Sequence, residues 1–159
     1  MDAFARIAAR LDYPMFVVTT AAGDERAGCL VGFATQASIG PARFLIGLSD
    51  KNHTYRVARA ADRLAVHLLP RRHKALAGLF GEHTGDSEDK FARCDWHRGP
   101  GDVPILDDAA AWFSGPIVHS APLGDHVGFL IEPDSGECPD LTEVITFRDV
   151  QELDPGHEA

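Results

Sequence analysis

The side chains best suited to chemistry follow an apolar run near the middle of the chain. The run Phe44–Leu48 leads into residues 49–54, SDKNHT, a dense group of hydrogen-bonding side chains. An earlier apolar run, Gly28–Phe33, is separated from it by a turn at Gly40-Pro41. Donors that end a strand just before a helix can hold an anion. The two runs together could therefore hold a flat apolar ring and its anionic tail.

Other reactive residue types have simpler interpretations. Cys29 has no matching histidine–acid pair, so the sequence favours a small buried thiol over a nucleophile. The eight histidines include no pair at HxxxH spacing and no accompanying cysteine pair, so we predict no metal site. The three cysteines, Cys29, Cys94 and Cys138, are odd in number and far apart, which indicates reduced thiols rather than disulfides.

Length, composition and charge narrow the class of protein. The chain has 159 residues, so we predict a single domain over residues 1–159, with about 134–159 as an acidic C-terminal extension. A formal net charge of −9 argues against nucleic acid or an anionic membrane as a partner. No apolar run approaches the roughly 18 residues of a membrane span, and the first residues lack the basic start of a signal peptide. A cytoplasmic location is the resulting prediction.

The composition favours short strands separated by turns, because the chain contains 15 glycines and 10 prolines. Apolar spacing predicts helices over 4–11, with Asp2 as N-cap, over 55–63, capped by Asp50 or Asn52, and over 74–80, stopped by Gly81. We predict that residues 34–38 form a polar connector and that residues 82–90 form a mobile surface loop. The expected strands are 15–20, 27–33, 44–48, 64–69, 109–113, 116–120, 126–131 and 144–147. Six to eight strands with two or three small helices fit a closed or nearly closed β-barrel.

Several short sequence markers follow one another in a set order and spacing, and none of them is specific alone. These markers are Gly28–Pro41, 49–54, Leu76–Phe80, Asp89–Ala92, Trp96, Pro104–Asp107, Trp112 and Gly124–His126. With these markers the chain resembles the flavin reductase-like family from about Phe4 to Ile131. The resemblance implies an FMN-binding split β-barrel, mainly β with short helices, antiparallel and Greek-key-like.

The resemblance implies that the flavin ring lies against the backbone of Gly28–Phe33, where two glycines permit close approach. The family commonly carries hydroxyl residues where this chain has Gly32 and Phe33. That departure removes side-chain hydrogen bonds to the ring, each worth about 0.5–1.5 kcal/mol. Thr35 and its neighbours follow the family's polar connector toward the ring edge or ribityl chain. The expected cofactor-binding residues are Gly28, Cys29, Leu30, Val31, Gly32, Phe33, Gln36, Ser38, Ser49, Lys51, Asn52, Thr54 and Phe80.

Residues 50–54 match the family's phosphate-binding turn. There Lys51 would supply charge, Asn52 and Thr54 would donate hydrogen bonds, and the following helix would add the positive end of its dipole. Asn52 and Thr54 also fit as helix caps alone, and Lys51 as a solvated surface charge. Asp50 is expected to point outward, since it would repel a phosphate.

His126 stands where the family often has a histidine near the open face of the flavin. It is the expected catalytic residue, positioning the nicotinamide or stabilising charge on the reduced flavin. A surface histidine after the Gly-Asp turn is the alternative interpretation.

The implied function is an NAD(P)H-dependent flavin reductase that uses FMN or FAD and transfers hydride to flavin N5. The resemblance further implies a homodimer with the flavin cleft at the subunit interface, to which Trp112 or the 82–90 loop of the partner contributes. A flavin-dependent monooxygenase is a possible acceptor of the reduced flavin. The alternatives are an FMN-binding or carrier protein without efficient reductase activity, and a barrel without flavin that acts as an interaction module.

Overall fold

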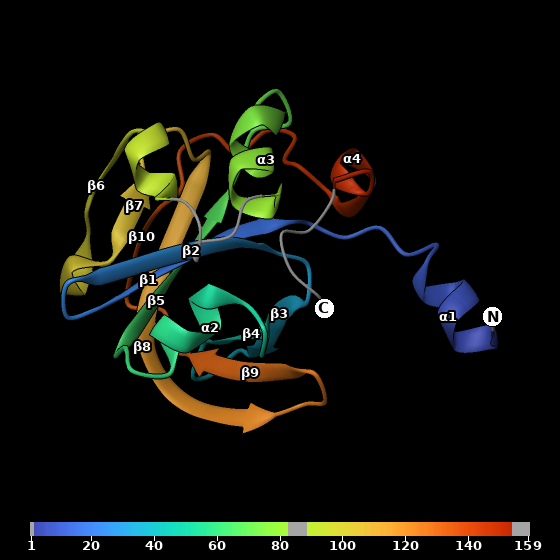
Figure 1. The fold of residues 1–159 in the computed structure, drawn as a ribbon, viewed down its shortest axis with the longest axis horizontal. Helices are drawn as coiled ribbons and strands as arrows, with labels where there is room; N and C mark the ends of the chain where they lie inside the picture. The colour runs from blue at the N-terminus through green and yellow to red at the C-terminus, as the bar shows by residue number, and fades with distance from the viewer. Residues whose placement is uncertain (1, 83–88, 154–159) are drawn as a thin grey trace.

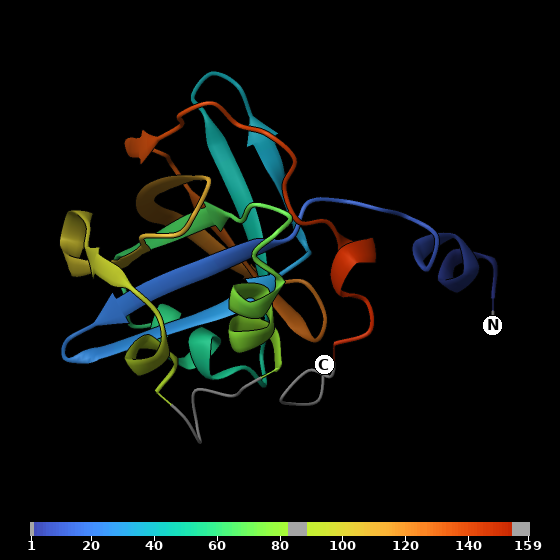
Figure 2. The same cartoon turned by 90° about the horizontal axis from the view of Figure 1, so that it is seen from above.

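An antiparallel sheet of eight strands forms most of the molecule in the computed structural model, which describes residues 2–82 and 89–153. The strand order is β2-β1-β5-β8-β9-β4-β3, and β10 pairs with β8. The sheet curls around a core into a half-barrel (Figures 1 and 2). The predicted fold class is therefore confirmed. The strands are β1 (Phe16–Ala22), β2 (Glu25–Val31), β3 (Ala34–Ser38), β4 (Arg43–Ser49), β5 (Arg63–Leu68), β8 (Ala111–Pro122), β9 (His126–Ile131) and β10 (Ser135–Glu137).

The sheet is open between β2 and β3, which stand at opposite ends of the strand order. These two edge strands follow one another in the chain, and Gly32 and Phe33 connect them. The β1–β2 hairpin turns at Gly23, whose φ of 59° favours glycine. An edge strand pairs on one side only, so the outer backbone groups of β2 face away from the sheet.

Two clusters of buried side chains fill the two sides of this sheet. One lies inside the curl and includes Val18, Ile46 and Ile131. The other lies at α3 (Lys74–Glu82) and includes Phe80 and Ile145. Burial of this apolar surface is the main source of stability for such a sheet.

The helices are short. They are α1 (Ala3–Ala8), α2 (His53–Ala58), α3 (Lys74–Glu82) and α4 (Phe147–Val150), with 3₁₀ turns η1 (Lys90–Arg93) and η2 (Pro100–Asp102). Asp2 and Asn52 cap α1 and α2 as predicted. The α1 helix extends away from the rest of the molecule (Figures 1 and 2), and it leaves Phe4 and Ile7 exposed. In the described part of the chain, no helix is long and apolar enough to cross a membrane.

Several predicted boundaries in the first half of the chain were wrong. Residues 34–38 form strand β3 rather than a connector, and because β3 is an edge strand most of its side chains are exposed. Helix α1 ends at Ala8 and α2 at Ala58, whereas α3 continues past Gly81 to Glu82. Most of the predicted 82–90 loop, residues 83–88, lies outside the described residues.

In the second half, the two strands predicted around Ser114-Gly115 are one strand, β8. The Cβ of any side chain at Gly115 would clash with the Glu132 carbonyl oxygen, so this glycine allows two segments of the chain to pass close together and does not mark a break in the strand. Residues 144–147 make only isolated bridges before α4 begins. The sequence also missed β10 and the small pair formed by β6 (Trp96–Arg98) and β7 (Pro104–Leu106).

The acidic C-terminal segment contributes to the core. Ile145 is fully buried and Val150 nearly so, in the same cluster as α3. The division into one domain and an extension stays a prediction.

Candidate ligand-binding cleft

A cleft of about 400 Å³ lies beside the open edge of β2. Its volume is within the range typical of small-molecule sites. Its walls come from β2, β4, α3, and the segments at residues 13–15 and 147. The lining residues are Tyr13, Met15, Cys29, Leu30, Val31, Gly32, Phe33, Gly47, Leu48, Ser49, Asn52, Phe80, Gly81, Lys90, His126 and Phe147.

Glycines keep the backbone accessible at two places on the cleft wall, Gly32 just after β2 and Gly81 in α3. A Cβ at Gly32 would lie 2.7 Å from Tyr13 Cε2 and 2.9 Å from Met15 Sδ. At Gly81 it would lie 2.9 Å from a methyl carbon of Leu30. A larger residue at either position would push side chains into the cleft. The glycines therefore leave room for a flat group close to the main chain.

Hydrogen-bonding side chains lie at the end of β4. Asn52 Oδ1 accepts from the backbone N–H of Thr54 at 2.8 Å, and thereby caps α2. Ser49 Oγ accepts from the backbone N–H of Lys51 at 3.3 Å. Both Ser49 and Asn52 line the cleft, whereas Lys51 and Thr54 do not. The turn thus presents only part of the predicted cluster to a ligand.

His126 stands opposite Ser49 at the start of β9. Its Nδ1 lies 2.7 Å from Asp125 Oδ1, and this hydrogen bond lowers the pKa of the Asp125 carboxyl. Its ring contacts that of Phe33, with centroids 4.9 Å apart. Both rings also line a second apolar pocket of about 430 Å³, together with Leu45 and Leu123. The Phe33–His126 pair therefore stands between the two cavities.

Lys90 is a buried lining residue that the sequence interpretation placed in a surface loop. Its side chain begins in η1, and Nζ donates to the carbonyl oxygens of Gly28 at 3.0 Å and Phe80 at 3.1 Å. Only 5% of the residue is exposed. The pattern DKFA was noted as a family marker, but nothing in it signalled that the lysine points inward.

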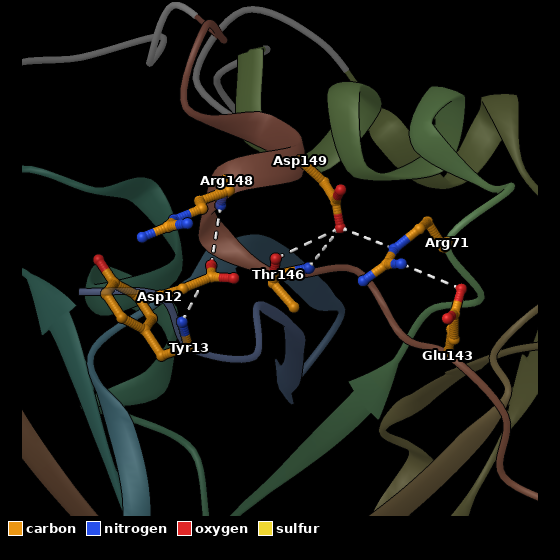
Figure 3. A network of polar contacts seen from close by, with 7 residues as sticks. All are labelled: Asp12, Tyr13, Arg71, Glu143, Thr146, Arg148 and Asp149. Atoms are coloured by element: carbon orange, nitrogen blue, oxygen red, sulfur yellow. Dashed lines mark hydrogen bonds and ion pairs between the residues drawn. The ribbon is translucent and has the colours of Figure 1, made fainter. Parts of the chain in front are cut away.

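The outer wall of the cleft depends on contacts between the two ends of the chain. Tyr13 and Phe147 stack with ring centroids 5.0 Å apart. A polar network holds their segments in place (Figure 3). In it Asp12 Oδ1 accepts from the backbone N–H of Arg148 at 3.0 Å, and that hydrogen bond lowers the pKa of Asp12.

The same network joins α4 to the segment before α3. Asp149 Oδ2 accepts from the backbone N–H of Thr146 at 2.9 Å and from Arg71 Nε at 3.3 Å. Arg71 also forms an ion pair with Glu143 at 3.0 Å. These contacts fix the position of Phe147 at the cleft, an arrangement that no local sequence pattern indicates.

The structure brings together most of the predicted site residues. Those that line the cleft are Cys29, Leu30, Val31, Gly32, Phe33, Ser49, Asn52, Phe80 and His126. Outside the lining, Gln36 and Ser38 bond to one another on β3, and Lys51 lies 3.7 Å from Asp50 with half of its side chain exposed. The roles of these residues toward a ligand stay predictions.

Three further predictions concern a thiol, a metal site and a tryptophan. The Cys29 thiol is buried, and burial raises its pKa, so it is poorly suited to act as a nucleophile. Within residues 2–82 and 89–153, no group of three or more histidine, cysteine, aspartate or glutamate side chains is placed to hold a metal ion. Trp112, proposed from the sequence to reach a partner's site, packs against Ala65, Val103 and Ile105 of its own chain.

This arrangement suits a flat, largely apolar ligand that carries a negative charge. Apolar side chains and exposed backbone form the walls, and the polar groups gather at Ser49, Asn52, Lys90 and His126. No aspartate or glutamate of the described residues lines the cleft. A flavin nucleotide has these properties, so the residues present fit one.

Comparison with known proteins gives three findings. The model of the family described as "Flavin reductase like domain" matches residues 8–150. The chain is 32% identical over 118 residues to an FMN reductase (NADH), RutF, of Variovorax paradoxus, covering 74% of this chain and 65% of the relative. It is 32% identical over 114 residues to the stachydrine N-demethylase reductase subunit Stc3 of Rhizobium meliloti, covering 69% of this chain and 48% of the relative.

A solved structure confirms the same fold. The NADH:FAD oxidoreductase SgcE6 of Streptomyces globisporus C-1027 superposes with a TM-score of 0.82 at 24% identity, over 90% of this chain and 85% of that one. At 24% identity this superposition supports a shared fold and nothing further. The matched region spans less than two thirds of the length of the two relatives named above.

Proposed function

The chain belongs to the flavin reductase-like family, and from this premise we propose that it is an NAD(P)H-dependent flavin reductase. FMN or FAD would bind in the cleft beside β2. The observation that carries the proposal is the cleft itself: an open strand edge, a glycine at its end, apolar walls and a polar end at Ser49 and Asn52. The relatives named as an FMN reductase and an NADH:FAD oxidoreductase support it.

When bound, the flavin supplies the chemistry, because its N5 accepts a hydride from the reduced nicotinamide. The protein contributes position rather than acid–base catalysis. The edge of β2 and Gly32 provide a flat backbone wall, and Tyr13 and Phe147 exclude water from its outer side. His126, held by Asp125 and Phe33, stands at the other end, where it can orient a second ring. Cofactor-binding roles for Gly28, Gln36, Ser38 and Thr54 are part of the same proposal.

Steady-state oxidation of NADH and NADPH with FMN and with FAD tests this function. We expect turnover with at least one pair. Absence of oxidation with all four pairs, in protein shown to be folded, would contradict it.

We also propose that reduced flavin passes to a flavin-dependent monooxygenase and that the protein is a homodimer located in the cytoplasm. The reductase subunit of an N-demethylase among the relatives supports a separate acceptor. The exposed apolar side chains of α1 support a contact with a second copy. Sedimentation of the purified protein, alone and with a candidate acceptor, checks both associations.

An FMN carrier is the second candidate, and Phe33 is the observation that favours it. The ring is 61% exposed and rests against His126, at the boundary of the cleft. A ring in that place can hinder the approach of a nicotinamide. Protein that retains FMN but reacts slowly with both nicotinamides would favour the carrier, and faster reduction in Phe33→Ser would identify the ring as the obstacle.

A further inference from the structure

The last stretch of the described chain, residues 143–153, passes along the outer side of the cleft. Near its middle the Phe147 ring stacks on Tyr13 with the ring planes inclined by 14°, and both rings line the cleft. Near its end, Leu153 comes within 3.4 Å of the position that a Cβ would take on Gly81, a lining residue of α3. The stretch therefore connects the segment before β1 with helix α3, and both of these contribute to the cleft wall. We call residues 143–153 the strap.

One residue anchors the strap in the core. Ile145 has no exposed surface, and it belongs to the same buried cluster as Phe80. Its backbone N–H donates to the Leu69 carbonyl oxygen at 3.0 Å, and its own carbonyl oxygen accepts from the backbone N–H of Met15 at 3.0 Å. These contacts precede α4 in the chain, so they do not depend on the position of that helix.

The residues after this anchor are held more weakly. Helix α4 has four residues, about one helical turn, and of these only Val150 is buried. Arg71 pairs with Glu143 and with Asp149, but the side chains of Arg71 and Glu143 are 45% and 77% exposed. Exposed ion pairs contribute little to stability, and an isolated helical turn is unstable. Local opening of α4 should therefore require less free energy than unfolding of the sheet.

Hydrogen bonds and the aromatic stack join α4 to the segment before β1. The backbone N–H of Phe147 donates to the Tyr13 carbonyl oxygen at 2.8 Å, and that of Arg148 donates to Asp12 Oδ1 at 3.0 Å (Figure 3). The Arg148 guanidinium also donates to the Arg10 carbonyl oxygen at 3.1 Å. Breaking these hydrogen bonds and the stack would separate the strap from that segment and open the outer side of the cleft.

A flavin that lies along Cys29–Phe33 would have the stacked rings of Tyr13 and Phe147 on its outer side. We propose that the strap is a gate for this flavin, and that its opening at Phe147 sets the rate at which flavin enters and leaves the cleft. This inference rests on the proposed function, because it takes flavin as the ligand. Transfer of reduced flavin to a separate acceptor requires release, so the gate determines whether flavin is kept as a cofactor or exchanged as a substrate.

Two competing explanations give the strap a simpler role. If it only stabilises the fold, changes at Phe147 lower the free energy of unfolding without a specific effect on flavin exchange. If Phe147 is only a contact of the bound flavin, its loss speeds dissociation and leaves association unchanged. A gate limits passage in both directions, so its loss speeds both.

Stopped-flow FMN fluorescence measures association on mixing and dissociation on dilution for the wild type and for Phe147→Ala. We expect dissociation to become about 30-fold faster and association about fivefold faster, because an aromatic ring is removed from the gate. Phe147→Tyr keeps the ring and should stay within about threefold of the wild type. The matched control is Phe113→Ala, a half-buried phenylalanine of β8 that lines neither cavity, and it should change neither rate. Unchanged association in Phe147→Ala, or equal acceleration in Phe113→Ala, would overturn the inference.

A variant outside the cleft tests the same gate if Phe147→Ala does not fold. Arg71→Met removes the ion pairs of the strap and leaves the lining of the cleft intact. Both rates should rise about threefold, while the dissociation constant changes less than about twofold. The control is Arg43→Met, which removes a comparable ion pair between β4 and Glu132 and should leave both rates unchanged. Rates in Arg71→Met equal to those of the wild type would contradict the gate.

Hydrogen exchange of the wild type tests local opening without a mutation. In the flavin-free protein, the amide protons of Phe147 and Arg148 should be at least about tenfold less protected than that of Ile145, and bound FMN should slow their exchange. Equal protection at these positions would contradict local opening of the strap. FMN binding without oxidation of NADH or NADPH would contradict the reductase proposal instead, so the two failures are distinguishable.

Discussion

His67 and Lys90 are both buried polar residues that bond to backbone carbonyls, but they stand in different settings. His67 Nδ1 lies 2.9 Å from the Val17 carbonyl oxygen, and its Nε2 accepts from the backbone N–H of Leu106 at 3.1 Å. The residue has no exposed surface and lines none of the cavities described above. Lys90 has equally well-placed carbonyl partners, yet it lines a cleft. A polar group enclosed by the core serves stability alone, whereas a similar group at a cleft also forms part of the cleft wall. The two regions should therefore respond differently to mutation.

The largest expected effect is on the stability of the protein, from replacing the core residue His67. Replacing His67 with leucine leaves the Val17 carbonyl and the Leu106 N–H without partners in a buried site. We expect the free energy of unfolding to fall by about 4 kcal/mol, from two unsatisfied groups and imperfect packing. Urea denaturation measures the loss. Binding of FMN to the folded fraction should be unchanged, and a selective loss of FMN affinity would erase the contrast with Lys90.

The pH dependence of stability comes from the same residue. Burial lowers the pKa of His67 from an ordinary 6.5 to about 4, so the folded protein holds the ring neutral. The stabilisation is complete above pH 6.5 and is lost as the pH falls from 6.5 through 4, because the unfolded chain binds the proton first. The difference corresponds to about 3 kcal/mol. Urea titrations across this range should show the decrease in the wild type but a much shallower one in His67→Leu; matching slopes would place the pH dependence elsewhere.

Most of the strands could be predicted from the sequence because their signals are local. Runs such as Phe16–Thr20 and Phe44–Leu48 carry the branched and aromatic residues of buried strands. The same local reading failed at β3, whose polar side chains reflect an exposed edge, and at β8, where Gly115 suggested a break. Pairing with distant strands decides both cases, and it has no local signature.

The site residues also fall into those that local sequence predicts and those that it does not. The sequence predicted Cys29–Phe33, Ser49 and Asn52, because they belong to one apolar strand and to the turn that follows another. Tyr13, Phe147 and Lys90 reach the cleft only through packing between distant segments, which short-range patterns do not contain. Lys51 was proposed from its neighbours in sequence; its side chain lies beside Asp50, and its role toward a ligand stays a prediction.

At the cleft, a side chain added at Gly32 should weaken FMN binding with little loss of stability. In Gly32→Val the new side chain would meet Tyr13 and Met15, and the flexible ends of both would move into the cleft. We expect FMN affinity to fall about 20-fold, equivalent to about 2 kcal/mol. The matched control is Gly40→Ala, where an added Cβ meets nothing within 4 Å. Calorimetric titration with FMN measures both variants, and unchanged affinity in Gly32→Val would place the ring away from this wall.

The smallest expected effect is at the open end of the cleft. His126→Ala removes the ring that Asp125 and Phe33 hold in place. We expect flavin reduction by NADH to slow about tenfold, equivalent to about 1.4 kcal/mol, while FMN affinity changes less than about threefold. Anaerobic stopped-flow absorbance gives the rate, and His119→Ala, an exposed histidine of β8, is the control. Identical rates in His126→Ala and the wild type would make the residue a bystander.

The central claim is that the cleft beside β2 holds a flavin nucleotide. A crystal structure of the protein grown with FMN tests it most directly. We expect the ring along Cys29–Phe33 and the phosphate at the polar end of the cleft, where Ser49 and Asn52 lie. FMN bound elsewhere on the chain, or a cleft closed by its own side chains in the presence of saturating FMN, would contradict it.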